Sequence, residues 1–179
     1  MAIGVNADAY QPIERTHRIT RAVLELLAET EHPALIVTKS AGVLRDLDLL
    51  REMAGKNLAQ VSVSITTLEP DLARKMEPRA ATPSRRLATV GALAGAGVPV
   101  SVLVAPIIPG LNDHELERIL EAAAEAGADT AGTILLRLPH ELKPIFTDWL
   151  DVHFPDRARR VLNLLRQCRG GEPNEGGFG

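Results

Sequence analysis

Residues 98–113, VPVSVLVAPIIPGLND, contain the transition that decides the fold. Residues 98–104 are apolar and rich in valine, as in a buried strand. The following residues include two prolines and Gly110, which are typical of a turn, and Asn112 with Glu115 three residues later fits the capping box of a helix. Apolar residues then recur at helical spacing, at Leu116, Ile119, Leu120 and Ala123. The stretch therefore predicts a strand, a turn and an amphipathic helix in succession.

The same alternation occurs along the whole chain. The other apolar runs that predict strands lie at residues 2–6, 34–38, 61–66 and 131–138. Helix boundaries are marked by Thr82 before Pro83, which fits an N-cap and first helical position, and by Gly97 and Gly127, which fit C′ positions. Strands that are apolar on both faces and alternate with helices indicate an α/β fold with a covered parallel sheet.

Repeating units of roughly thirty residues suit a βα barrel or a doubly wound sheet. Five strands do not close a barrel of eight, and the spacing alone leaves both architectures open. Two more helices are predicted after the last strand, and Asp156 is expected to cap the second. We expect residues 1–169 to form one domain and residues 170–179, GGEPNEGGFG, to form a disordered tail.

Composition excludes several classes of protein. The 179 residues include 20 lysines and arginines against 23 acidic residues, and a formal net charge of −3 does not indicate nucleic acid as a partner, although a local basic patch stays open. Cys168 is the only cysteine and the histidines are scattered, so we expect no metal site. No apolar run has the length of a membrane span, and we expect a cytoplasmic protein.

Polar side chains follow the predicted strands, at the edge where parallel βα folds bind ligands. They are Asn6 and Asp8 after the first strand, Thr38, Lys39 and Ser40 after the second, Ser64, Thr66 and Thr67 at the third, and Arg137 at the fifth. The fourth strand continues into APIIPGLND. We therefore expect a ligand site at this edge.

Each of these residues also has an ordinary structural interpretation. Lys39 could meet an anionic ligand or pair with Asp8 or Glu14, and those two acids could form a general acid and base or serve the backbone. Ser64 and Thr66 share a face and could offer hydroxyl groups to a sugar or to the backbone.

The loop EPRAATPSRR, residues 77–86, has the same ambiguity. Arg79 could bind a carboxylate in bidentate fashion or form a loop salt bridge with Glu77. The APIIPGLND segment could wall a ligand or be a plain turn before a helix.

Five segments, GVNADAYQPIE, IVTKS, SVSITTLEP, MEPRAATPSRRL and APIIPGLND, occur in the order found in one family. From residue 3 to about residue 170 the chain resembles radical S-adenosylmethionine (SAM) proteins, in particular the bacterial branch related to spore photoproduct lyase. The resemblance implies a partial, TIM-like (βα) barrel with about five parallel strands. In family members a [4Fe-4S] cluster binds SAM there and reduces it to a 5′-deoxyadenosyl radical, which abstracts hydrogen from a substrate. By analogy that substrate is a DNA lesion or a nucleotide, and its identity is open.

The resemblance also implies roles for particular residues. Asn6 and Asp8 would contact the methionine amino group, and Lys39 its carboxylate. Ser64 and Thr66 would contact the ribose. The turn containing Pro106 and Ile107 would form an apolar wall beside the adenine. The implied cofactor-binding set is completed by Thr38, Glu77 and Arg79.

One family feature is missing from this sequence. Family members carry a Cys-x-x-x-Cys-x-x-Cys loop after the first strand, whereas Cys168 is the solitary cysteine here and cannot ligate such a cluster alone. We therefore expect the chain to be the carboxyl-side part of a radical SAM core, without its first strand and cluster loop, through the design of the expressed chain, a misplaced start codon or a gene fragment. Alone, it is expected to lack radical chemistry.

Two other functions stay open. A cofactor-free aldolase-like or isomerase-like enzyme could use Lys39 as a Schiff-base amine, with Asp8 or Glu77 as the base. Alternatively, the chain could be a non-catalytic remnant that binds SAM, a partner or nothing, with an exposed sheet edge that favours a homodimer.

Overall fold

The computed structural model describes residues 1–139 and 141–168. In chain order the elements are β1 (Ala2–Ile3), α1 (Glu14–His17), α2 (Ile19–Glu29), β2 (Ala34–Thr38), the 3-10 helix η1 (Ala41–Asp46), α3 (Leu47–Gly55), β3 (Ala59–Ser64), α4 (Pro70–Met76), α5 (Pro83–Gly95), β4 (Val100–Ile107), the 3-10 helix η2 (Asp113–Glu115), α6 (Leu116–Glu125), β5 (Thr130–Leu135), α7 (Leu142–His153) and α8 (Pro155–Gln167).

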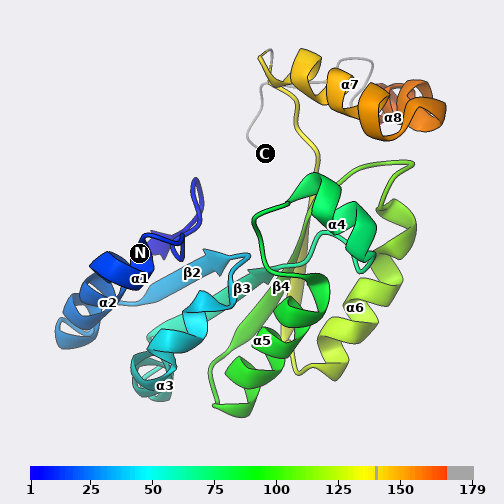
Figure 1. The fold of residues 1–179 in the computed structure, drawn as a ribbon. Coiled ribbons are helices and arrows are strands. Elements are labelled where there is room, and N and C mark those ends of the chain that lie inside the picture. The colour runs from blue at the N-terminus through cyan, green and yellow to red at the C-terminus, as the bar shows by residue number, and fades with distance from the viewer. Residues whose placement is uncertain (140, 169–179) are drawn as a thin grey trace.

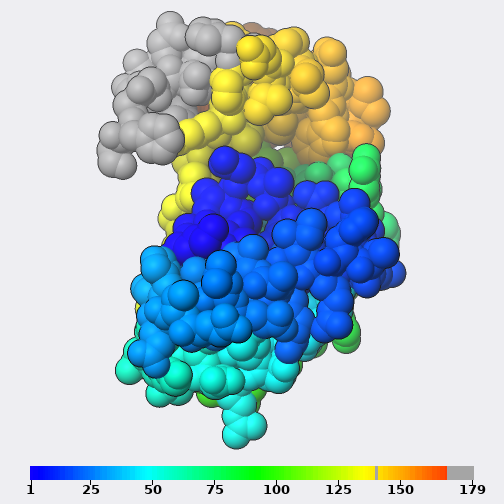
Figure 2. Space-filling model, turned by 90° about the vertical axis from the view of Figure 1, so that its left-hand side faces the viewer, coloured from blue at the N-terminus to red at the C-terminus, as the bar shows by residue number. Residues whose placement is uncertain are grey.

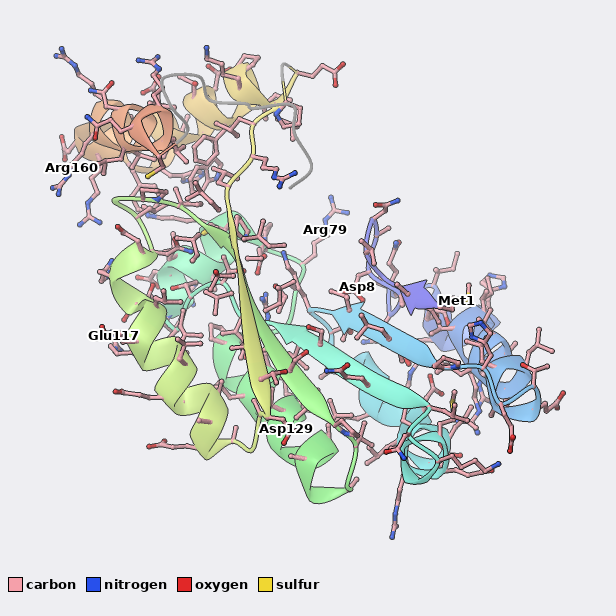
Figure 3. All side chains as sticks on the ribbon, turned by 180° about the vertical axis from the view of Figure 1, so that it is seen from behind. Met1, Asp8, Arg79, Glu117, Asp129 and Arg160 are labelled. Atoms are coloured by element: carbon pink, nitrogen blue, oxygen red, sulfur yellow. The ribbon has the colours of Figure 1, made fainter. Side chains whose placement is uncertain are left out.

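The five strands form one parallel sheet in the order β1-β2-β3-β4-β5. Crossovers between parallel strands are almost always right-handed, so strands that follow chain order place their connecting helices on one face. Figure 1 shows α2, α3, α5 and α6 along one side of the sheet, and Figure 3 shows the strands from the other side. The predicted α/β class and partial βα barrel are confirmed, with somewhat different strand limits.

The main core lies between the sheet and these helices. Valines and isoleucines of β2, β3 and β4 pack there against leucines of α2, α3 and α5, such as Leu24, Leu50 and Leu93. The sequence predicts a sheet covered by helices, but Leu35 of β2 and Ile134 of β5 are 36% and 46% exposed. The physical reason is that the helices cover only one face of the sheet.

The first strand is shorter than predicted because Gly4 turns the chain away from β2. Its φ is +89°, which favours glycine, and a Cβ at this position would lie 2.0 Å from the carbonyl oxygen of Val37. The backbone of residues 4–8 therefore leaves the sheet and lies over its edge.

Three of the predicted helix boundaries are confirmed. The Thr82 hydroxyl accepts a hydrogen bond from the Arg85 backbone N–H at 3.3 Å, with Pro83 as the first helical residue. Gly97 and Gly127, with φ values of +78° and +96°, follow the ends of α5 and α6. The predicted Asp156 cap is wrong, since α8 begins at Pro155 and Asp156 lies in its first turn.

The predicted capping box of Asn112 and Glu115 is also wrong. The Asn112 side chain makes no cap bond and instead holds the preceding turn, and the buried Glu115 carboxylate accepts from the Leu68 backbone N–H at 2.8 Å and from the Thr67 hydroxyl. Both side chains instead bond to buried backbone groups of neighbouring loops, which would otherwise lack a hydrogen-bond partner, whereas a helix start at the surface can bond to water.

The last two helices pack over a second, smaller core. Leu150 of α7 and Val161 and Leu165 of α8 pack in one cluster with Leu72 of α4 and Leu111. Figure 1 shows this helical pair above the carboxyl ends of the strands. The predicted tail, residues 170–179, lies outside the described residues. No helix within residues 1–139 and 141–168 is both long and apolar enough to cross a bilayer.

Candidate functional site

A cleft of about 450 Å³ lies at the carboxyl ends of the strands. Its lining comes from the ends of all five: residues 4–8 after β1, residues 37–39 at the end of β2, Ser64 of β3, residues 103, 105 and 106 of β4, and residues 134–137 at the end of β5. Figure 2 shows the first residues, in dark blue, next to the yellow segment around residue 135. The chain thus brings together at one place strand ends that are far apart in the sequence.

Six of the ten predicted site residues line this cleft: Asn6, Asp8, Thr38, Lys39, Ser64 and Pro106. The other four, Thr66, Glu77, Arg79 and Ile107, lie outside its lining. Of these, Ile107 ends β4 and pairs with Leu135.

Asp8 ties the end of β1 to the end of β2. Its Oδ1 accepts from the Tyr10 backbone N–H and the Thr38 hydroxyl, each at 2.8 Å, and its Oδ2 accepts from the Lys39 backbone N–H at 2.7 Å. The buried Glu14 carboxylate accepts from a backbone N–H of α2 at 3.0 Å. Both acids thus serve the backbone rather than acting as an acid and base pair.

The Lys39 ammonium pairs with Glu77 and not with either predicted partner. One Glu77 oxygen contacts Lys39 Nζ and accepts from the Thr66 hydroxyl at 3.1 Å, and the other contacts the Arg86 guanidinium. Burial alone would raise the pKa of Glu77, but Arg86 and Lys39 together outweigh it and lower that pKa. Glu77 is therefore a charged carboxylate that links the Lys39 and Arg86 side chains beside the cleft.

Arg86 is the residue of this network that the sequence analysis missed. Its side chain is 3% exposed and donates to the backbone carbonyls of Ser64 at 2.9 Å and Ala81 at 2.8 Å. The buried face of α5 includes Arg86, Val90 and Leu93. An arginine within such an apolar helical stripe is the sequence signal that could have identified Arg86 as a buried residue. A buried guanidinium needs a carboxylate nearby, and Glu77 provides it.

The Ser64 and Thr66 hydroxyls bond to the protein backbone. Ser64 donates to the carbonyl of Ala105 at 3.3 Å, where the chain enters a cis peptide bond to Pro106. The single Thr66 hydroxyl hydrogen is shared between that carbonyl, at 3.2 Å, and Glu77. The Asn112 side chain fixes the same turn, since its amide donates to backbone carbonyls at 2.8 and 3.0 Å and its oxygen accepts from a backbone N–H at 2.6 Å. These bonds set the shape of the β4 side of the cleft.

Arg79 is exposed, and the predicted salt bridge with Glu77 is not formed. Within the described part of the chain its side chain has no hydrogen bond or ion pair. Figure 3 shows Arg79 and Asp8 at the same end of the sheet. Arg79 therefore presents a guanidinium to solvent near the strand ends.

The chain lacks the donors of an iron-sulfur cluster. Cys168, its only cysteine, is exposed at the end of α8. Among the described residues no three His, Cys, Asp or Glu side chains are grouped so that they could hold a metal ion. A [4Fe-4S] cluster is held by several thiolates, so the residues present do not fit it.

The cleft does fit a small organic ligand. Leu103, Pro106 and Ile134 give it apolar lining, while Asn6 and the partly exposed Lys39 contribute polar groups. Its volume lies within the range of about 300 to 1,000 Å³ of small-molecule sites. An apolar wall with a nearby cation suits a ligand that combines an aromatic ring with an anionic group.

A parallel βα sheet with a cleft at its strand ends has the architecture of a partial βα barrel, a fold that binds ligands at that edge. The chain belongs to the Radical SAM superfamily, which residues 4–123 match. The uncharacterised proteins Mb2609c of Mycobacterium bovis and Rv2578c of Mycobacterium tuberculosis are each 33% identical to it over 169 residues, covering 93% of this chain and 50% of theirs. The chain thus spans about half the length of these curated relatives.

Solved structures share the fold. A spore photoproduct lyase variant with bound AdoMet and dinucleoside spore photoproduct matches with a TM-score of 0.59 and 17% identity, over 92% of this chain and 58% of that one. A second variant, with dinucleoside spore photoproduct, matches with a TM-score of 0.59 and 20% identity, over 83% of this chain and 44% of that one. The structural likeness to spore photoproduct lyase agrees with the resemblance read from the sequence.

Proposed function

We propose that the cleft binds SAM and that this chain forms part of a radical SAM core. The observation that carries the proposal is the convergence of all five strand ends on one cleft that contains Lys39. Membership of the Radical SAM superfamily and the AdoMet bound to a protein of the same fold support this choice of ligand.

In this proposal each side of the cleft has a role. Lys39 binds the methionine carboxylate, and Asn6 contacts the amino group. Pro106 and Ile134 enclose the adenine in an apolar environment. Asp8 and Glu77 act indirectly, since they hold the backbone and the side chain of Lys39.

SAM bound at a reducing cluster supplies the hydrogen-abstracting chemistry of this superfamily. The chain has one cysteine, so we assign it no cluster and no reductive step of its own. We propose that it binds SAM without cleaving it. The fold neighbours were solved with a dinucleoside photoproduct, which makes a nucleic-acid component the first substrate class to test.

The contacts of Lys39 disfavour the aldolase-like alternative. A Schiff-base lysine attacks as an uncharged amine. Here Lys39 Nζ is paired with the Glu77 carboxylate and is not free to attack a carbonyl group.

Calorimetric titration of the chain with SAM tests the proposal. We expect saturable binding that Lys39→Ala weakens roughly ten- to a hundredfold, the equivalent of a charged hydrogen bond. Ile134→Trp should block binding by filling the apolar side. Lys56→Ala is the matched control, because Lys56 pairs with Glu31 on the exposed surface at 3.1 Å and is expected to leave the affinity unchanged.

Two results would reject the proposal. One is the absence of SAM binding to the unaltered chain, and the other is equal affinity of the Lys39→Ala and Lys56→Ala variants. Anaerobic reconstitution with iron and sulfide tests the assignment of no cluster separately. Stoichiometric cluster binding together with SAM cleavage by this chain would contradict it.

A further inference from the structure

A second hollow, of about 250 Å³, lies away from the cleft and shares no lining residue with it. Four arginines and one acid line it: Arg15, Arg18, Arg21, Arg45 and Asp46. They come from α1, the start of α2 and η1. We call this site the arginine hollow. Gathering four guanidinium groups around one space is unfavourable unless acceptors balance them.

The acid in the arginine hollow is already satisfied. Asp46 is buried, its Oδ1 accepts from Arg21 Nη1 at 3.2 Å, and its Oδ2 accepts from the Tyr10 hydroxyl at 3.0 Å. Arg21 also binds both oxygens of Asp48, at 2.9 and 2.8 Å, and these bonds help to hold the pKa of Asp48 at about 2. Arg21 thus pairs with three acids, Asp46, Asp48 and, at 2.9 Å, Glu25, and none of these three acids pairs with Arg15, Arg18 or Arg45.

The remaining arginines have spare donors. The exposed side chains of Arg15 and Arg18 have no hydrogen bond or ion pair within the described part of the chain. Arg45 uses Nε and Nη1 on the carbonyls of Gly42 and Glu14, at 3.3 and 3.1 Å, so its Nη2 stays available. Its guanidinium lies 5.8 Å from the centre of the buried Tyr10 ring, which helps to hold it in place.

The start of α2, next to the arginine hollow, is already served by a protein carboxylate. The Glu14 side chain accepts from the Thr20 backbone N–H at 3.0 Å, so the proposal rests on the arginines and not on the helix start. The volume is below the roughly 300 Å³ at which sites for drug-sized molecules begin, so it suits an anionic group rather than a whole nucleotide.

We propose that the arginine hollow binds a phosphate group, carried either by a small phosphorylated molecule or by a nucleic-acid backbone. Guanidinium groups bind phosphate oxygens through N–H donors, which Arg15, Arg18 and Nη2 of Arg45 supply. The arginine hollow shares no residue with the cleft, so a failure of this proposal and a failure of the proposed function are independent results.

Thermal unfolding in inorganic phosphate, against chloride at the same ionic strength, tests the site. At a tenfold excess over the dissociation constant, we expect phosphate to raise Tm by roughly 3 to 6 °C. Arg15→Ala with Arg18→Ala should remove this rise. Neither side chain has a partner to lose, so the double variant should fold, which circular dichroism checks.

Arg157→Ala with Arg160→Ala is the matched control, because it removes the same charge from exposed positions on α8. This control should keep the phosphate response. Equal responses of the two double variants, or no response of the unaltered chain, would overturn the proposal.

Fluorescence anisotropy with a labelled single-stranded oligonucleotide distinguishes the two sources of phosphate. Weaker binding specific to the Arg15 and Arg18 double variant supports a nucleic-acid backbone as the ligand. A phosphate response without oligonucleotide binding at this site supports a small phosphorylated molecule.

Discussion

Arg86→Met should strongly destabilise the protein, because it leaves the Glu77 carboxylate buried with one cation fewer. The Glu77 side chain is 11% exposed, and Arg86 also satisfies two backbone carbonyls that would lose their donor. Breaking a buried ion pair from one side costs about 3 to 5 kcal/mol. Lys39 still contacts Glu77, so we expect the loss to lie in this range and not above it.

Urea unfolding at pH 7 measures this loss. Far-UV circular dichroism and the fluorescence of Trp149, the single tryptophan, provide two probes of the transition. The double variant with Glu77→Gln should recover at least about 1 kcal/mol, because it removes the unpaired charge. Arg85→Met is a control, since Arg85 is the exposed neighbour of Arg86.

The pH dependence gives a second, independent check. The folded-state pKa of Glu77 lies below its ordinary value, so this group stabilises the protein above about pH 4.3 and the stability is lost as pH falls through the folded pKa. Without Arg86 the effect of burial is less opposed and the folded pKa rises. The difference in unfolding free energy between the variant and the unaltered protein should therefore become smaller below about pH 4. A loss under about 1 kcal/mol at pH 7, or one that is constant with pH, would refute this account.

Three further substitutions test the supports of the two sites. Tyr10→Phe removes the hydroxyl bound to buried Asp46 and should lower the free energy of unfolding in urea by about 2 kcal/mol. In the unaltered protein, burial and Asp46 raise the pKa of Tyr10, so this sole tyrosine should ionise in alkali only as the protein unfolds. Asn112→Ala leaves three backbone groups without their partner and should cost about 3 kcal/mol, with a loss below 1 kcal/mol arguing against its role in the turn. Gly4→Ala brings a methyl group against the Val37 carbonyl, so hydrogen exchange should show faster opening of β1 with β3 unaffected.

The sequence was sufficient for the fold where the signal was local. Strand runs, helical stripes and the glycines at positions 97 and 127 depend on neighbouring residues, and their predictions are confirmed. Asn112 and Glu115 match a local pattern too, but buried backbone groups elsewhere in the fold take both side chains. A pattern of residues does not reveal such a competitor, because it is brought close only by the tertiary structure.

For the candidate site, the position of the residues could be predicted from the sequence but their contacts could not. The predicted residues at strand ends reach one cleft because parallel strands share a carboxyl edge, which the order of elements already implies. Their hydrogen bonds could not be predicted. Glu77 and Arg86 are nine residues apart on a loop and a helix, and only the folded chain shows that Glu77 also reaches Lys39.

That shared carboxylate has a consequence for ligand binding at the cleft. A ligand carboxylate must compete with Glu77 for Lys39. If Lys39 were the only cation at Glu77, releasing it would leave a buried charge unpaired. Arg86, at 3% exposure, stays on the other oxygen, and Lys39, at 36% exposure, is the partner with room to move. Arg86 thus keeps Glu77 paired while Lys39, the more exposed cation, moves to bind a ligand anion, which lowers the free-energy cost of binding in the proposed SAM site.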